Sequence, residues 1–304
     1  MITAFNRRTF LKTAALGLGA ASAASALTGK HRAIQIGQTI LTWAMPLAEP
    51  DQIEQGIRDI ASLGYYGIEL FGTNLQALQE NGETLIPLLQ KYNVPLVSCY
   101  CNVHLTDPVL FKTSLERLVE AGNIIKKAGG RVAVLGPNAV PRETYDFKAY
   151  KSQMVSRLNE CGKAVTDLGL TAVFHQHTST CIETREETVA VMEAVDTRYV
   201  KFGPDIGQLQ KGGADPLEIL KHFLPIVQHC HLKDYLGGPN WAGYCPLGQG
   251  KLDIPAILDL FEGKQLAGMV MVELDQSEKM PLTAIECSKA SKAYLEKLGC
   301  GFRS

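Results

Sequence analysis

Short apolar runs rich in β-branched residues recur along this chain, and each is followed by a stretch whose apolar residues have helical spacing. Strands that alternate with helices form a parallel sheet, and 304 residues are enough for a barrel of about 250. No Gly-x-Gly-x-x-Gly segment follows a strand, which disfavours a doubly wound dinucleotide fold. The sequence therefore predicts an α/β protein, a single-domain (β/α)8 TIM barrel.

Eight strands and eight helices are expected, with short connections between most of them. The strands are expected at residues 33–37, 67–71, 94–100, 131–135, 171–175, 199–205, 226–231 and 269–273. The helices are expected at residues 51–63, 74–92, 110–127, 145–168, 183–195, 216–223, 254–261 and 282–298. One long connection, 234–253, is too rich in Gly and Pro for a helix and belongs to the face where such loops build substrate pockets.

The last four strands each end on a residue type that binds metals: His175, Asp205, His231 and Glu273. The carboxyl ends of barrel strands converge on one mouth, so these side chains are expected to meet there. Any one of them alone is equally well explained as a cap or a satisfied polar group, but four in succession are not. Imidazoles mixed with carboxylates favour one divalent cation of the Mn2+, Co2+, Fe2+ or Zn2+ type over Ca2+ or Mg2+.

Other polar residues near these strand ends are candidates for catalysis or substrate binding. Glu273 is a candidate base as well as a ligand, and His177 and Lys233 are candidate acid/base groups. For Lys233, a salt bridge to Asp234 or to another carboxylate at the barrel mouth is an equally good interpretation. The candidate substrate-binding residues are Glu69, His104, Gln208, Trp241 and Tyr244. The structural alternative is a buried polar contact for Glu69, loop packing for His104, and packing of the long loop for the two aromatic residues.

The N-terminal segment has the pattern of an export signal. Arg7 and Arg8 precede an apolar stretch of small residues, 13–27, with Ala-x-Ala cleavage sites at its end. We expect residues 1–26 to be a twin-arginine signal peptide and residues 27–304 to form the periplasmic domain, without stable membrane insertion once the signal is cleaved. An uncleaved membrane anchor is the alternative, although the stretch is short for a span of about 20 residues.

The charge and cysteine content of the chain limit which partners and metal sites are expected. The formal net charge is −1 and neither sign forms a block, which argues against a nucleic-acid surface. The eight cysteines include no Cys-x-x-Cys pair, so a structural zinc site is not expected and most thiols should be small buried groups. Whether any of them form disulfides, and whether the chain forms a homo-oligomer, the sequence leaves open.

Six segments carry a resemblance to a known family. They are Gly67-Ile-Glu69, His175-Gln-His177, Asp205-Ile-Gly-Gln208, His231-Leu-Lys-Asp234, Pro246-Leu-Gly-Gln-Gly250 and Val272-Glu-Leu-Asp275. With them the chain resembles the xylose isomerase-like TIM barrels of the sugar phosphate isomerase/epimerase superfamily over about residues 33–298. The segments around His175 and Gly212-Gly-Ala-Asp-Pro216 are similar to the inosose dehydratase/isomerase branch. Tagatose epimerase-like enzymes form the other branch.

The resemblance implies a metal held by a carboxylate, Asp, His and Glu after strands five to eight, which Asp205, His231 and Glu273 match. His175 departs from the glutamate of many epimerases, and Gln208 replaces the histidine of their Asp-x-x-His. The implied function is a divalent-metal-dependent isomerase or epimerase of a sugar or keto-sugar, acting through an enediolate. A metal-dependent lyase that dehydrates a keto-sugar or inosose is the first alternative, and a non-catalytic exported sugar-binding barrel is the second. The partner implied is a small sugar or polyol.

Overall fold

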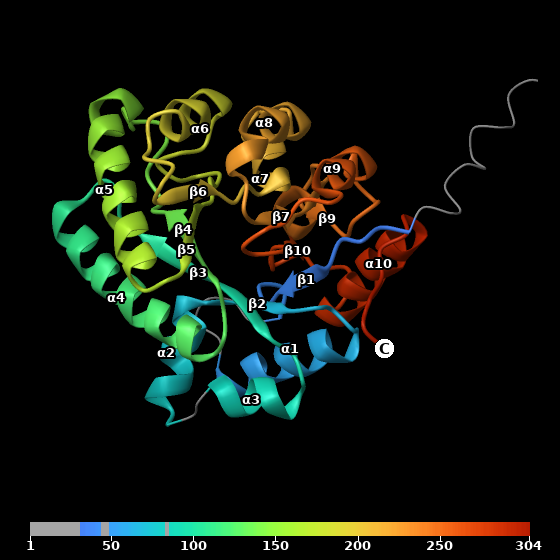
Figure 1. Cartoon of the computed structure of the whole chain (residues 1–304). Helices are drawn as coiled ribbons and strands as arrows, with labels where there is room; N and C mark the ends of the chain where they lie inside the picture. The colour runs from blue at the N-terminus through green and yellow to red at the C-terminus, as the bar shows by residue number, and fades with distance from the viewer. Residues whose placement is uncertain (1–30, 44–48, 83–84) are drawn as a thin grey trace, which may run out of the picture.

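The computed structural model describes residues 31–43, 49–82 and 85–304, so the expected signal peptide lies outside the described residues. Eight parallel strands form one sheet in the order β6-β5-β4-β3-β2-β1-β10-β7 (Figure 1). The strands are β1 (Ile36–Thr39), β2 (Ile68–Phe71), β3 (Leu96–Val103), β4 (Val132–Pro137), β5 (Thr171–Phe174), β6 (Val200–Phe202), β7 (Cys230–Leu232) and β10 (Val270–Val272). This is the predicted fold class, with the eight strands near the predicted positions.

The two outer strands of this sheet, β6 and β7, are joined beyond their regular pairing. Parallel bridges link Phe202 to Val227 and Asp205 to His231. The amide of His231 donates to the carbonyl of Pro204 over 2.9 Å. These contacts curl the sheet into the barrel and place two of the expected metal ligands side by side.

Ten helices are described, and they surround the sheet (Figure 1). They are α1 (Pro50–Ser62), α2 (Gly72–Glu80), α3 (Leu85–Lys91), α4 (Pro108–Lys127), α5 (Phe147–Asp167), α6 (Arg185–Met192), α7 (Ile206–Lys211), α8 (Pro216–Phe223), α9 (Ile254–Phe261) and α10 (Ala284–Lys297). The apolar stripe of α1 shows how they pack, because Ile53, Ile57 and Ile60 are fully buried at helical spacing. None of the helices in the described ranges has both the length and the apolar character needed to cross a membrane.

Two helices differ from the prediction. The expected helix 74–92 is two helices, α2 and α3, because Gly82 has a φ of +72° in the left-handed region that ends a helix. The short helix α7 was not expected. It begins directly after Asp205, whose carboxylate accepts a hydrogen bond from the amide of Gln208 over 2.9 Å and so caps its first turn.

The long connection after β7 is an ordered loop. It contains an antiparallel pair, β8 (Asp234–Tyr235) with β9 (Tyr244–Cys245). The Asp234 carboxylate holds the C-terminal part of the loop, because it accepts hydrogen bonds from the amides of Gly248 and Gly250 over 3.0 and 2.9 Å. A Cβ at Gly250 would lie 2.1 Å from Asp234 Oδ1, so the close approach requires glycine there.

Candidate active site

The four expected metal ligands lie together at the mouth of the barrel. His175 follows β5, Asp205 begins α7, His231 lies in β7 and Glu273 follows β10. Donor atoms of His175, Asp205 and His231 all lie within 4.8 Å of one another. Glu273 adjoins them, with its Oε2 3.1 Å from His231 Nδ1. All four side chains are buried.

Lys233 links the carboxylates of this cluster. Its Nζ is fully buried and lies 2.8 Å from Asp205 Oδ2, 2.6 Å from Glu273 Oε1 and 2.5 Å from Asp275 Oδ1. The ring of Tyr244 covers the ammonium group, with its centroid 4.7 Å from Nζ. Burial alone would lower the pKa of Lys233, but the three carboxylates outweigh it and raise that pKa well above its usual range. The salt-bridge interpretation of Lys233 therefore agrees with the structure, with other barrel-mouth carboxylates as partners, while Asp234 accepts from loop amides.

His231 lies between two carboxylates, those of Glu273 and Glu69. Burial would lower its pKa, but Glu273 and Glu69 outweigh burial and raise it well above its usual range. Burial would raise the pKa of Glu273, but His231 and Lys233 hold it well below its usual range. His231 and Lys233 thus lie among four carboxylates, which are Glu69, Asp205, Glu273 and Asp275.

Several buried atoms of the cluster make only ion-pair contacts, and His175 is the member with a buried atom that makes no polar contact among the described residues. Its Nδ1 is buried and has no hydrogen-bond partner. Burial, and His231 next to it, lower the pKa of His175 well below its usual range, so the ring is neutral. A neutral imidazole beside Asp205 and His231 is a donor set that suits a transition-metal ion, so the residues fit the expected cation.

A second cluster shares His231 on the other side of its ring. Glu69 Oε1 lies 2.8 Å from His231 Nε2, and Glu69 Oε2 lies 2.9 Å from His229 Nε2 and 2.5 Å from Ser98 Oγ. All of these side chains are fully buried. Burial would raise the pKa of Glu69, but His231 and His229 outweigh it and lower the pKa to about 2. Every polar atom of this cluster lies within hydrogen-bond or ion-pair distance of another, whereas His175 Nδ1 has no such neighbour, so the His175 side is the better candidate for a cation site.

His177 has both ring nitrogens in contact with neighbours. Its Nδ1 lies 2.7 Å from the carbonyl of Thr178, which requires a proton on Nδ1. Its Nε2 then accepts from the side-chain amide of Gln208 over 2.9 Å. Gln208 Oε1 in turn accepts from the hydroxyl of Thr178 over 2.8 Å. His177 can accept a proton on Nε2 only after it leaves Gln208.

A cavity of about 370 Å3 opens over the metal cluster. His175 and Glu273 form part of its floor, and His177 is on its wall. None of the five expected substrate-binding residues is among the described residues that line it. Glu69 and Gln208 are buried. Trp241 and Tyr244 pack the long loop against Leu274 after β10 and Cys287 in α10, and His104 is half-buried on the loop before α4.

Several polar residues that line this cavity were not predicted from the sequence, among them Tyr100, Asn102 and Asp275. Asp275 lies two residues beyond Glu273. Because alternate residues of a strand face the same side, that spacing is the signal that could have found it. Tyr100 and Asn102 have the same relationship at the end of β3, where the ring of Tyr100 contacts that of His175 with centroids 5.2 Å apart.

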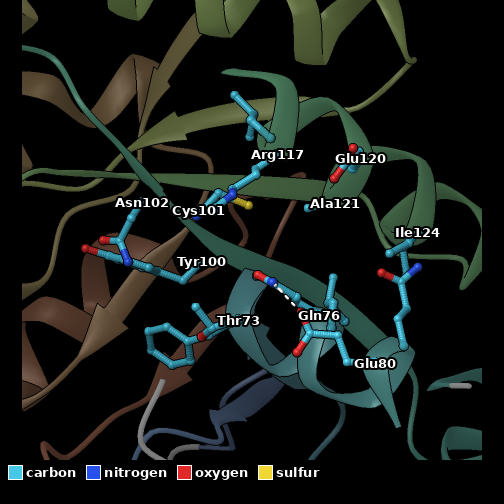
Figure 2. Close-up of a pocket in the computed structure, with 15 residues that line it drawn as sticks. Thr73, Gln76, Glu80, Tyr100, Cys101, Asn102, Arg117, Glu120, Ala121 and Ile124 are labelled. Atoms are coloured by element: carbon cyan, nitrogen blue, oxygen red, sulfur yellow. Dashed lines mark hydrogen bonds between the residues drawn. The ribbon is translucent and has the colours of Figure 1, made fainter. Parts of the chain in front are cut away.

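A second cavity of about 300 Å3 lies between α2 and α4 and shares Phe71, Tyr100 and Asn102 with the first (Figure 2). Its acidic and basic residues, Glu80, Arg117 and Glu120, are exposed. It contains no cluster of buried acid/base groups among the described residues, so we place the chemistry at the barrel mouth.

The eight cysteines are all free and buried, which agrees with the expected role as small packing groups. Burial raises the pKa of the Cys161 thiol to about 12.

Comparison with known proteins places the chain in a family. The sequence model described as "Xylose isomerase-like TIM barrel" matches residues 57–296. An inosose dehydratase of Clostridium botulinum (strain Alaska E43 / Type E3) is 24% identical over 294 residues, which cover 87% of this chain and 97% of the relative.

Solved structures agree on the fold. The probable 3-DHS dehydratase AsbF of Bacillus anthracis has a TM-score of 0.70 at 17% identity, over 86% of this chain and 99% of its own. The IOLI protein, solved with a zinc atom, has a TM-score of 0.71 at 16% identity, over 87% of this chain and 98% of its own. The family match extends over most of the barrel, and the chain belongs to the xylose isomerase-like TIM barrel family.

Proposed function

We propose that this protein is a divalent-metal-dependent lyase that dehydrates a keto-sugar or keto-polyol. The observation that carries the proposal is the placement of the carboxylates. Among the described residues that line the mouth cavity, only Glu273 and Asp275 are acidic, and both follow β10. Acid/base chemistry by carboxylates is therefore confined to one face of a bound substrate.

His175, Asp205, His231 and Glu273 would hold the cation. Once bound, the ion supplies Lewis-acid stabilisation of the negative charge that develops on a substrate carbonyl oxygen. The residues themselves orient the substrate and move the proton. Glu273 is ionised because His231 and Lys233 lower its pKa, so it is in the unprotonated form that a base requires.

In the proposed step, Glu273 removes the proton from the carbon next to the carbonyl, and the electron pair of that C–H bond forms an enediolate. The β-carbon then loses its hydroxyl group. Glu273 returns the proton to the departing oxygen on the same face, and water leaves as the carbon–carbon double bond forms. Base and acid are one group, so the step needs no second carboxylate across the cavity.

An aldose–ketose isomerase is the second candidate. It is supported by Glu273, which matches the glutamate that the epimerases have after strand eight. A single base can carry a proton between neighbouring carbons of an enediolate on one face. Epimerisation is less well supported, because it needs an acid on the opposite face. There the cavity offers His175, which is neutral, and His177, whose Nε2 is held by Gln208. The geometry therefore favours the lyase over the isomerase or epimerase that the sequence put first. The inosose dehydratase relatives support the same order.

The test is a product screen of metal-reconstituted protein with inosose, ketohexoses and 3-keto-glycosides, followed by NMR in D2O. A lyase yields a product that has lost a hydroxyl group. Deuterium at one carbon with the skeleton retained supports the isomerase instead. A protein that binds the sugars but neither exchanges a proton nor binds metal is a sugar-binding barrel, which contradicts the proposal.

We also propose that the protein works in the periplasm, on the basis of the paired arginines. Replacing both Arg7 and Arg8 by Lys removes the feature that the twin-arginine export machinery reads. Cell fractionation should find the variant retained in the cytoplasm. A variant found in the periplasm at the normal level contradicts the assignment.

A further inference from the structure

The ring of His231 lies between two carboxylates, each facing a different nitrogen. Glu273 Oε2 lies 3.1 Å from Nδ1, on the side of the mouth cavity. Glu69 Oε1 lies 2.8 Å from Nε2, on the closed side of the barrel. Which nitrogen binds a cation therefore depends on which one keeps its proton.

His229 settles how the Glu69 carboxylate is used. The amide of Met269 donates to His229 Nδ1 over 3.2 Å, and a backbone N–H is always a donor. The neutral ring therefore has its proton on Nε2 and donates it to Glu69 Oε2 over 2.9 Å. Ser98 Oγ donates to the same oxygen over 2.5 Å. Oε2 is thus occupied, and Oε1 is left for His231.

This arrangement is tightly built. A Cβ at position 268 would lie 2.2 Å from His229 Nδ1, so Gly268 is what lets the backbone approach the ring. Glu69 is opposite Ser98 in the register of β2 and β3, which brings their side chains together. Since Glu69, Ser98 and His229 are fully buried, water cannot replace any of these contacts.

We propose that Glu69 is a positioning residue that keeps the proton of His231 on Nε2, so that Nδ1 is the nitrogen presented to the cation. Glu69 Oε1 and His231 Nε2 make an ion-pair contact of 2.8 Å, and two lone pairs at that distance would repel, so Nε2 is the nitrogen that keeps its proton. Carboxylates that accept from the second nitrogen of a metal-binding histidine fix its tautomer and raise its basicity. The inference rests on the proposed function in one respect, which is that a cation binds at the mouth.

The first measurement needs no variant. Long-range 1H–15N spectra of the Zn2+-loaded protein report which nitrogen of each histidine carries a proton. We expect a protonated Nε2 and a zinc-bound Nδ1 for His231, and a protonated Nε2 for His229. A zinc-bound Nε2 in His231 overturns the proposal.

The second measurement compares zinc dissociation constants, obtained by competition with a chromogenic chelator. Glu69→Gln keeps the size of the side chain but presents an NH2 donor to one of the two imidazoles. It should weaken zinc binding by about 10- to 100-fold, the range for residues that hold metal ligands in place. Ser98→Ala is the matched control, because it leaves both imidazole contacts of Glu69, and it should cause a smaller loss.

The outcomes separate this inference from the proposed function. If the wild-type protein binds zinc and Glu69→Gln changes neither the dissociation constant nor the tautomer of His231, the positioning role is wrong while the metal site stands. If the wild-type protein binds no zinc, the proposed function fails and this inference fails with it. Should Glu69→Gln not fold, the spectra of the wild-type protein still decide the question.

Discussion

The two sides of His231 contain the same residue types at similar burial but differ in how their polar atoms are used. On the closed side, Glu69 faces His229 Nε2 and His231 Nε2 at 2.9 and 2.8 Å. On the open side, His175 Nδ1 has no partner, and His175 and Glu273 border a cavity of about 370 Å3. Both sides could be described as metal-type clusters.

The difference shows what identifies a functional cluster. Residue type and burial do not separate the two sides, since both include imidazoles and carboxylates that are almost fully buried. A buried polar atom without a partner costs free energy, so it is retained where a ligand completes it. Other buried atoms of the two clusters make at least an ion-pair contact, whereas His175 Nδ1 makes no polar contact among the described residues, and it belongs to the open side that borders the cavity. We therefore interpret the open side as the site of chemistry and the closed side as its support.

The largest expected effect comes from removing a ligand on the open side. Asp205→Asn keeps an oxygen that can cap α7 but removes the negative charge at the metal site. We expect zinc affinity to fall by more than about 100-fold, beyond the range for a residue that only supports a ligand. The chelator competition used for Glu69 measures it. A loss no larger than that of Glu69→Gln would mean that the open side is not where the metal binds.

The next largest effect concerns proton transfer. Glu273→Gln retains a metal-binding oxygen but has no basicity, so turnover should fall by at least about 100-fold at matched metal occupancy. Glu278→Gln is the control, because it makes the same change on an exposed side chain of the same segment. Near-normal activity of Glu273→Gln would move the base to another residue, with His177 the next candidate.

Much of the fold follows from the sequence because its signals are local. Apolar spacing located the strands and helices, and caps such as Asp146 before α5 and Thr283 before α10 set their starts. The division of the expected helix 74–92 depends on the backbone conformation of Gly82, which apolar periodicity does not record. Helix α7 is only six residues long, too short for a clear periodic pattern.

The residues at the strand ends were predicted from the sequence, whereas several residues that line the cavity were not. The rule that strand ends converge brought His175, Asp205 and His231 together, and the structure places them within 4.8 Å. The depth of a side chain in the barrel depends on strand register, which the sequence does not state. Glu69 is opposite Ser98 and is fully buried, while Asp275 was missed although it lines the cavity.

The smallest effect tests the closed side through pH. The folded pKa of Glu69 is about 2, below its value of about 4.3 in an unfolded chain. A lowered folded pKa gives stability that is present above the unfolded pKa and is lost as pH falls toward the folded one, because the unfolded state takes up the proton first. Between about pH 4.3 and 2, this one group contributes a slope of up to about 1.4 kcal/mol per pH unit in the free energy of unfolding.

Glu69→Gln removes that contribution, so the stability of the variant should fall less steeply with acid than that of the wild type. Denaturant unfolding at a series of pH values measures the difference, and Glu278→Gln, which alters an exposed carboxylate, should leave the slope unchanged. Equal slopes for wild type and Glu69→Gln would show that Glu69 is not held ionised by the two histidines, and the distinction between a paired side and an open side of His231 would be lost.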